Sequence, residues 1–207
     1  MAFPTTGVLD TFSTGSAMSA DWSADPFNFG GIVFDIISGS ATTENAATYC
    51  AAYWDTASFG PASEVFCTII EKPSAGGDFA IGVRIANPDS ASASGYRVGF
   101  FNTVARVYRV DNATPTQLGA DISVTVANGD KVGFEANGST LTVYRDTGGG
   151  WTSIGSRSDS TYTAAGFISL EAYNGGVDNP NFDDFGGGTI SGDPPTEINP
   201  ESLFSAG

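Results

Sequence analysis

Apolar and polar residues alternate along much of this chain with a period of two, the spacing of side chains on the two faces of a β-strand. Residues 79–87 read FAIGVRIAN: every second position from Phe79 to Ile85 is apolar, and Arg84 falls on the opposite face. No stretch combines helical periodicity with good helix formers. About twelve to fourteen such short segments predict an all-β fold, an antiparallel sandwich of two stacked sheets.

The clearest single turn lies in KVGFEANGSTLTVYRD, residues 131–146. Asn137 and Gly138 both tolerate a positive φ, which makes them a strong two-residue hairpin turn. Folding about this turn sets Phe134 opposite Leu141 and collects the apolar residues on one face. The segment is therefore predicted to be a half-buried antiparallel ribbon.

A second hairpin, with its turn at residues 102–103, sets Arg97 opposite Tyr108 and places Arg106 on the same outward face. Arg84 is predicted to project outward from the preceding strand. If these strands share one sheet, they form a basic, aromatic-flanked patch. Such a patch suits an acidic partner surface or a charged glycan, because arginine makes bidentate contacts and stacks on rings. The alternative is an ordinary polar sheet face.

Two tryptophans extend the candidates for glycan binding, because indole rings stack on the apolar faces of sugars. Trp54 and Trp151 both lie near predicted loops. Trp54 fits the hydrophobic core equally well. These two residues join the arginine patch as predicted partner- or glycan-binding residues.

Composition agrees with a single all-β domain over residues 1–190. The chain has 207 residues with 27 Gly and 15 Phe, and glycine and aromatic residues are typical of turns and strands. Residues 191–207 differ, with three prolines, no cations and no periodicity. This segment is predicted to be an irregular tail that serves as an assembly arm against the domain or against another copy of the chain.

The net charge is −15, and no lysine or arginine occurs before Lys72 or after Arg157. Nucleic acid and anionic membrane surfaces are therefore not expected partners, because both require clustered cations. No apolar segment approaches the length of a membrane span. Residues 1–4 show neither a cationic start nor a long apolar run, so no secretory signal is expected.

The chain has two cysteines, Cys50 and Cys67, which flank a predicted loop in what reads as a long hairpin. Cross-strand proximity would permit a disulfide. The favoured interpretation is two buried thiols that pack as small hydrophobic side chains. A metal site built on two cysteines without any histidine is improbable.

Five segments in order resemble one family across residues 6 to 190. The segments are LDTF (9–12), SFGPASEVFCTI (58–69), YRVDNATPTQLG (108–119), GDKVGFEANGSTLTVYRD (129–146) and FDDFGGGT (182–189). The series resembles the concanavalin A-like lectin/glucanase (laminin G-like) jelly rolls of bacteriophage virion and tail proteins and of bacterial surface proteins. The resemblance implies a jelly-roll fold and localisation in a virion made in the host cytoplasm.

Enzymatic residues of that family are not found. Its glucanases carry E-x-D-x-x-E on one strand, whereas Glu135 stands alone on its strand and Glu171 has no carboxylate within six residues. Without histidine, Ser-His-Asp and Cys-His nucleophiles are excluded within one chain. The sequence therefore predicts a protein that is not an enzyme.

The acidic pair in FDDFGGGT raises the question of a metal. On a regular strand Asp183 and Asp184 point to opposite faces, so they are not expected to act together. In the family, an aspartate of the last strand often helps to hold a structural calcium beside the first strand, and the resemblance implies this role for Asp183 with Asp10. The alternative is a solvated, negatively charged closing strand.

Two functions of different classes remain. The first is a non-enzymatic structural or attachment protein of a phage-like particle, in the capsid decoration or the tail, whose partners are other virion proteins or copies of itself. The second is a carbohydrate-binding or adhesion module for a cell-surface glycan. The first is favoured by the resemblance, and the fold alone does not decide between them.

Overall fold

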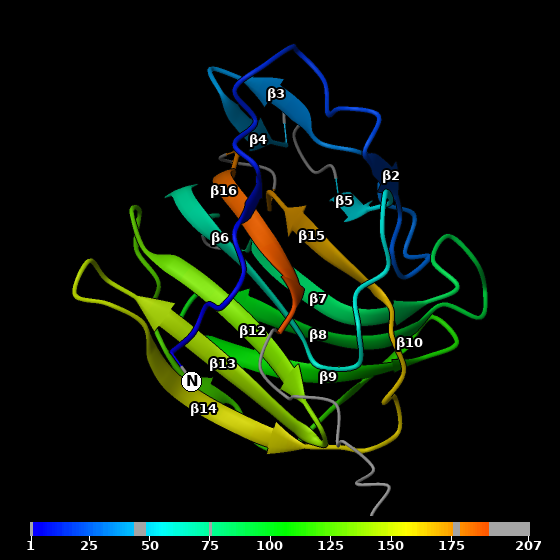
Figure 1. Cartoon of the computed structure of the whole chain (residues 1–207). Helices are drawn as coiled ribbons and strands as arrows, with labels where there is room; N and C mark the ends of the chain where they lie inside the picture. The colour runs from blue at the N-terminus through cyan, green and yellow to red at the C-terminus, as the bar shows by residue number, and fades with distance from the viewer. Residues whose placement is uncertain (1, 44–48, 75, 176–178, 191–207) are drawn as a thin grey trace, which may run out of the picture.

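The structure is a computed structural model that describes residues 2–43, 49–74, 76–175 and 179–190 (Figure 1). The described chain forms strands and turns without a helix, and the strands make two antiparallel sheets stacked as a sandwich. The prediction of an all-β, two-sheet jelly roll is confirmed. The predicted tail, residues 191–207, lies outside the described residues. In the described part of the chain, no helix is long and apolar enough to cross a membrane.

The sheet nearer the viewer in Figure 1 is here called the front sheet and the other the back sheet. The front sheet has the spatial order β14 (Thr152–Ser158), β13 (Thr140–Asp146), β12 (Lys131–Asn137), β6 (Ser63–Glu71), β16 (Asn181–Thr189), β4 (Ser40–Thr42) and β3 (Asp35–Ile37), with β1 (Val8–Asp10) paired to β16. The back sheet has the order β10 (Thr114–Gln117), β9 (Val104–Asp111), β8 (Ser94–Phe101), β7 (Asp78–Ala86), β15 (Phe167–Tyr173), β5 (Tyr49–Trp54) and β2 (Trp22–Ala24), with β11 (Ile122–Ser123) paired to β9. The predicted neighbourhood of the first and last strands is confirmed, since Val8 pairs with Gly186.

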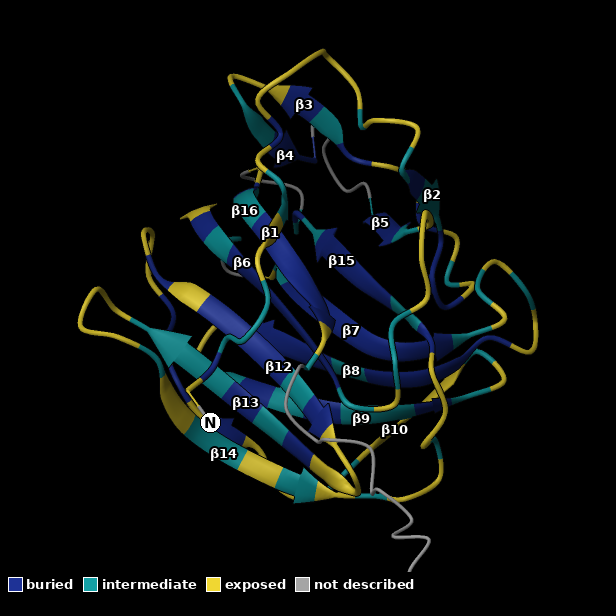
Figure 2. Ribbon diagram, in the orientation of Figure 1, coloured by how far each residue is buried: buried dark blue, intermediate teal, exposed yellow. Residues whose placement is uncertain are grey.

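One main core fills the space between the sheets. Phe79 on β7 stacks on Phe100 of β8, with ring centroids 4.8 Å apart, and lies 5.1 Å from the ring of Phe182 on β16 in the opposite sheet. Figure 2 shows that burial is greatest along the central strands, whereas the edge strand β14 is largely exposed or half-buried. Inward apolar residues alternate with outward ones, as the sequence pattern predicts.

The two predicted hairpins have different outcomes. The pairing of Arg97 with Tyr108 about the turn at residues 102–103 is confirmed. In the other hairpin, Asn137 pairs with Thr140 and Phe134 pairs with Val143, so the predicted pairing of Phe134 with Leu141 is wrong. The turn residues are 138–139 instead. A shift of two positions leaves every side chain on its predicted face, because the strand period is two.

Strand β7 departs from alternation at its end. A register shift lies between Val83 and Ala86, and Arg84 within it has a φ of 53°. The prediction that Ile85 shares the inward face with Val83 is therefore wrong: Ile85 packs with Phe27 in a separate small cluster. The bulge inserts a residue and reverses the faces beyond it.

The cysteines lie in different sheets, Cys50 on β5 and Cys67 on β6, so the predicted hairpin between them is wrong. Both are free and buried, which confirms the interpretation as buried thiols. Burial raises the pKa of Cys50 to about 12, with a further contribution from Asp35. Burial also raises the pKa of Cys67. Both groups stay protonated at neutral pH and pack as apolar side chains.

A polar cluster ties the segment after β14 to the back sheet. Asp159 accepts hydrogen bonds from Tyr96 Oη (2.7 Å), from Thr161 N (2.8 Å) and from Arg109 (3.0 Å). Burial raises the pKa of Asp159, but these hydrogen bonds outweigh it and lower the pKa to about 2. The ionised carboxylate is the form that this cluster stabilises.

We expect Asp159 to contribute to acid sensitivity. Its folded pKa lies below its unfolded value of about 3.9, so its contribution to stability is complete above that value and is lost as the pH falls towards 2. Unfolding by urea at several pH values between about 2 and 6 should show this loss in the wild-type chain. Asp159→Asn should be less stable at pH 6 and should have a flatter pH dependence. An equal slope in both chains would contradict the prediction.

Candidate functional site

Aromatic and charged side chains meet on the outer face of the back sheet around a hollow of about 330 Å³. We call this hollow the Arg97 site; it is lined by Phe29, Tyr49, Asp78, Arg97 and Tyr173. Its four strand residues come from β8, β7, β15 and β5, which are consecutive in the sheet. Four of the five lining residues therefore lie on hydrogen-bonded strands, and Phe29 lies on a loop.

Strand register brings these residues together. Tyr173 on β15 pairs with Asp78 on β7 at one side and with Tyr49 on β5 at the other. Glu171 lies two residues before Tyr173, so it points to the same face, and it forms the floor of the site. The two pairs join positions 95 and 124 residues apart in the chain, because β15 lies between strands that are distant from it in sequence.

A buried ion pair forms the floor. Arg97 lies 3.3 Å from Glu171 Oε2, and their side chains are 12% and 1% exposed. Tyr49 Oη donates a hydrogen bond to the same carboxylate oxygen. Burial disfavours the charge on Arg97, but Glu171, followed by Tyr49 and Asp78, more than compensates and raises its pKa. Arg97 Nε is buried without a hydrogen-bond partner among the described residues.

The pKa values of Tyr49 and Asp78 are both raised, which favours the neutral forms of these side chains. Burial raises the pKa of Tyr49 well above its usual value, and the charge of Glu171 adds to this effect. Burial also raises the pKa of Asp78; Arg97 opposes the shift and Glu171 adds to it. The site thus contains one cation and two carboxyl groups, and Asp78 is the more accessible of the two.

A loop after β2 completes the wall. Asp25 accepts hydrogen bonds from the backbone N–H groups of Phe29 (2.7 Å) and Gly30 (2.9 Å). This turn places the Phe29 ring 5.5 Å from the guanidinium carbon of Arg97, and the Tyr108 ring lies 6.0 Å from the same atom. The guanidinium is therefore flanked by rings as well as paired with Glu171.

Arg84 does not belong to the predicted patch. The expectation that it projects outward is wrong, because the bulge in β7 turns it inward, where it is 2% exposed. Its guanidinium donates to the carbonyl oxygens of Pro61 (2.6 Å), Gly138 (2.9 Å) and Tyr162 (2.9 Å). Burial lowers the pKa of Arg84, against a smaller opposing effect of Tyr96. Arg84 joins three chain segments and has a structural role.

Arg106 and Tyr108 lie on the outer face of the back sheet as predicted. Arg106 makes a bidentate pair with Asp121, with distances of 2.9 and 3.0 Å, and its guanidinium lies 4.8 Å from the centre of the Phe101 ring. Each arginine of the predicted patch on this face therefore has its own carboxylate, Glu171 for Arg97 and Asp121 for Arg106. The face is not the unpaired basic surface that the sequence suggested.

The two tryptophans lie elsewhere. Trp54 packs against Trp22, with ring centroids 5.5 Å apart, at the margin of the main core. Trp151 packs at 4.9 Å from the ring of Phe3 on the outer face of the front sheet. Neither residue lines the Arg97 site.

The aspartates near β1 and β16 are close enough to interact. Asp10 accepts hydrogen bonds from Phe12 N (2.7 Å) and Trp22 Nε1 (2.9 Å). Burial raises the pKa of Asp183, and the charges of Asp184 and Asp10 add to this effect. Among the described residues no group of three or more His, Cys, Asp or Glu residues is placed to hold a metal ion. The calcium role of Asp10 and Asp183 stays a prediction.

The prediction that Asp183 and Asp184 point to opposite faces is wrong. Asp183 pairs with Thr68, and Asp184 Oδ2 lies 3.3 Å from Thr68 Oγ1, so both aspartates lie on the outer side of β16. Asp184 has a φ of 48° within a register shift that follows Asp183. The bulge breaks the alternation on which the prediction relied.

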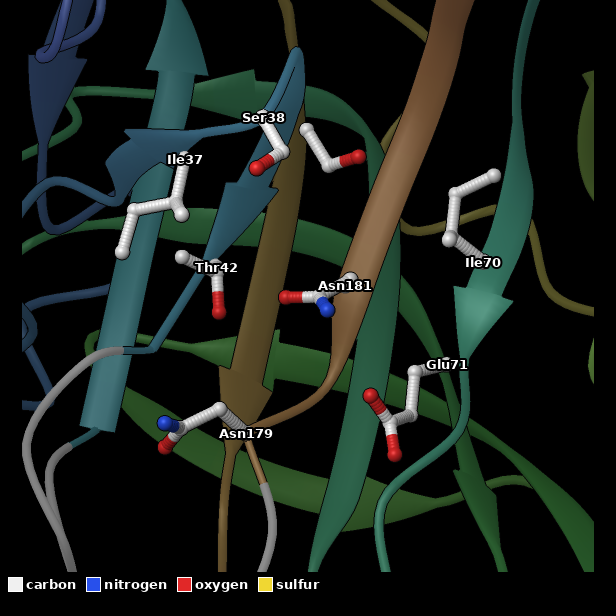
Figure 3. A pocket seen from close by; sticks show the side chains of 8 residues that line it. Ile37, Ser38, Thr42, Ile70, Glu71, Asn179 and Asn181 are labelled. Atoms are coloured by element: carbon white, nitrogen blue, oxygen red, sulfur yellow. The ribbon is translucent and has the colours of Figure 1, made fainter.

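A second hollow, of about 530 Å³, lies at the end of the front sheet between β3, β4, β6 and β16 (Figure 3). Its lining includes the exposed side chains of Ile37 and Ile70 together with Thr42, Glu71 and Asn181. None of the described residues that line it is aromatic. It lacks the ring-flanked ion pair of the Arg97 site and is the weaker candidate for specific recognition.

Comparison with known proteins identifies the fold. No family model and no curated protein sequence matches the chain. Among solved structures, carbohydrate-binding module CBM66 from Bacillus subtilis matches with a TM-score of 0.60 and 17% identity over 84% of this chain and 98% of that chain. A Bacillus subtilis protein of unknown function with a galectin-like fold matches at 0.64 and 12% over 88% and 96%, and a Bacillus licheniformis β-glucanase at 0.59 and 12% over 88% and 98%.

The fold is the concanavalin A-like, galectin-like jelly roll. The resemblance seen in the sequence is confirmed at this level, and these identities support the fold alone. None of the matching proteins described above bears on the expected phage context.

Sequence reasoning found Arg97 and Tyr108 but missed the residues that complete the site. Phe29, Tyr49, Asp78, Glu171 and Tyr173 lie on four other chain segments. Asp78 and Glu171 lie on the adjacent strands β7 and β15, so a pattern of carboxylates along one strand does not reveal them. One local signal was present: Asp25-Pro26 and Gly30-Gly31 indicate a turn, because Asp, Pro and Gly are typical turn residues.

Proposed function

We propose that this chain is a carbohydrate-binding module and that the Arg97 site is its sugar-binding site. One observation carries the proposal: aromatic side chains surround a polar floor in a hollow of about 330 Å³ on a rigid sheet face. Rings of Phe29, Tyr49 and Tyr173 offer surfaces for the apolar face of a sugar. Asp78 offers acceptors for hydroxyl groups, and Arg97 offers a donor. The structural similarity to a carbohydrate-binding module supports this choice.

The charges of the site favour a neutral sugar over an acidic one. Arg97 is the one cation among the lining residues and is paired with Glu171, and Asp78 adds a second carboxyl group. An acidic glycan would meet this excess of negative charge in a protein whose net charge is −15. The ligand class proposed here thus differs from the charged glycan that the arginine pattern suggested.

The same geometry supports binding without hydrolysis. Glycoside hydrolysis requires two carboxyl groups that both reach the scissile bond. Glu171 has a side chain that is 1% exposed and lies under Arg97 and Tyr49. With only Asp78 accessible in the site, we propose that the chain binds sugar and is not an enzyme.

The test is isothermal titration of the full-length chain with neutral oligosaccharides chosen from a glycan array. Tyr173→Ala and Asp78→Asn should each weaken binding about tenfold, through loss of a stacking ring and of a charged acceptor. The matched control is Asp121→Asn, which neutralises an exposed carboxylate in the connection just before β11 and outside the site. It should leave the affinity unchanged.

The proposal would be contradicted if no neutral glycan on the array bound the chain. It would also be contradicted if Asp121→Asn lost as much affinity as Tyr173→Ala and Asp78→Asn. New reducing ends after prolonged incubation with a bound polysaccharide would contradict the non-enzymatic part alone. The predicted role in a phage-like particle, with virion localisation and virion partners, stays a prediction, since no feature of the Arg97 site bears on it.

A further inference from the structure

A hollow of about 260 Å³ lies on the outer face of the front sheet, on the opposite side of the sandwich from the Arg97 site. We call it the Trp151 hollow. Its lining includes Val8, Phe66, Thr68, Lys131, Trp151 and Asp184. Trp151, which the sequence predicts to be a partner- or glycan-binding residue, therefore lines a hollow of its own although it does not belong to the Arg97 site.

The start of the chain forms one wall of the Trp151 hollow. Figure 1 shows this dark-blue segment in front of the strands of the front sheet. The ring of Phe3 stacks on Tyr144, with centroids 4.1 Å apart, and Glu64 Oε1 accepts hydrogen bonds from Thr6 N and Thr6 Oγ1, both at 2.7 Å. Because Thr6 also lines the hollow, the chain itself holds this wall in place before any ligand binds.

Two glycines keep aromatic rings close to the sheet beneath the hollow. Phe66 on β6 is 7% exposed, and a Cβ on Gly186 of β16 would lie 2.2 Å from its Cζ atom. A Cβ on Gly133 of β12 would lie 3.2 Å from Trp151 Cζ3. Side chains at these two positions would push the rings outward, so the absence of a Cβ leaves room above them.

Trp151 gives the hollow an aromatic surface. The residue is half-buried, and its two described ring contacts are with Phe3 at 4.9 Å and with Phe66 at 6.1 Å. Their interplanar angles are 77° and 68°, so no described ring lies flat on the indole. Val8, which is 48% exposed, adds an apolar side chain to the lining. This part of the hollow suits the apolar C–H face of a sugar ring.

Polar groups complete the lining. Strand register pairs Lys131 on β12 with Thr68 on β6, and Asp184 Oδ2 accepts a hydrogen bond from Thr68 Oγ1 at 3.3 Å. Lys131 is exposed, and no ion pair among the described residues involves it. Asp184 Oδ1 has no hydrogen-bond partner in the described part of the chain. One ammonium donor and one carboxylate acceptor are therefore free to bind hydroxyl groups.

We propose that the Trp151 hollow is a second binding site, separate from the Arg97 site, and that it takes a single neutral sugar ring. A sugar ring has an apolar face and a rim of hydroxyl groups, which match the indole surface and the polar groups of the lining. The charges of Lys131 and Asp184 balance, so an acidic sugar gains no net attraction in a chain of net charge −15. The volume is smaller than the roughly 300–1,000 Å³ of pockets for drug-sized ligands, which suits one ring.

The test uses the full-length chain with Tyr173→Ala and Asp78→Asn, which disable the Arg97 site so that the second site is measured alone. The isotope-labelled chain is titrated with the neutral methyl glycosides of glucose, galactose, mannose and xylose. The indole N–H signal of Trp151, assigned with Trp151→Phe, is followed by NMR. At least one glycoside should shift this signal until it saturates, with an affinity in the millimolar range because one ring makes few contacts.

Lys131→Ala should weaken this binding about tenfold, because a charged donor is lost. The matched control is Lys72→Ala, which removes a lysine that does not line the hollow and should leave the affinity unchanged. The proposal would be overturned if no glycoside shifted the Trp151 signal. Equal losses of affinity in Lys131→Ala and Lys72→Ala would also overturn it.

The Trp151 signal separates this proposal from the proposed function of the Arg97 site. If the chain with Tyr173→Ala and Asp78→Asn does not fold, the same titration of the wild-type chain gives the answer, because the signal reports on the front sheet. A wild-type chain that binds a glycoside while the Trp151 signal stays in place would overturn the second site and leave the Arg97 site standing.

Discussion

Replacing Arg97 by methionine is expected to lower the free energy of unfolding by about 3–5 kcal/mol, the cost of leaving a buried charge without its partner. The partner is Glu171, whose side chain is 1% exposed and lies 3.3 Å from Arg97. Tyr49 still donates a hydrogen bond to that carboxylate but supplies no charge. Urea unfolding of both chains at neutral pH, followed by intrinsic fluorescence, measures the difference.

The double variant Arg97→Met with Glu171→Leu separates the charge from the packing. It should recover most of the lost stability, because a buried ion pair replaced by apolar residues of similar volume often costs little. The double variant should nevertheless bind no sugar if the proposed function is correct. A single variant as stable as wild type would contradict the view that this pair is buried and coupled.

Replacing Arg84 by methionine is expected to lower the free energy of unfolding by about 3 kcal/mol, because buried carbonyl groups lose their donors. The guanidinium connects the carbonyl oxygens of Pro61, Gly138 and Tyr162, and the residue is 2% exposed. The free energy of unfolding of Arg84→Lys should lie between those of the wild type and Arg84→Met, because a single ammonium does not reproduce the planar array of donors of a guanidinium. Thermal and urea unfolding measure the series.

Arg157 provides a matched control for that experiment. It also donates to carbonyl oxygens, those of Leu118, Ser156 and Ala120, but it is only half-buried. Water can replace its donors, so Arg157→Met should cost less than about 1 kcal/mol. An equal loss of unfolding free energy in Arg84→Met and Arg157→Met would contradict the prediction that burial of the guanidinium determines the size of the loss.

Much of the fold could be predicted because strand patterning is local. The period of two identified the inward faces of β7 before its bulge and of the hairpin β12–β13, and it held even where the register of that hairpin was wrong by two positions. The pairing of Arg97 with Tyr108 followed from one short turn. Composition and the order of five motifs were enough for the jelly roll, which the structural matches confirm.

The alternation of apolar and polar residues does not predict the β-bulges. The positive φ of Arg84 turns its side chain into the interior. The positive φ of Asp184 places its side chain on the same side of the strand as that of Asp183. An inserted residue reverses the faces beyond it, and alternation alone does not reveal where it lies. The predictions for Arg84 and for the aspartate pair failed for this reason.

Sequence alone determined that the strands alternate, that one hairpin turns at residues 102–103, and that Arg97 and Tyr108 share a face. Only the tertiary structure decided which residues surround Arg97, because the strand order in the sheet places β15 and β5 beside the β7–β8 pair although both are distant from it in the chain. The tertiary structure also decided the charge of the site, because it brings Glu171 on β15 to 3.3 Å from Arg97 on β8. The physical reason is that local periodicity sets the face of a side chain, whereas its neighbours depend on which strands pair.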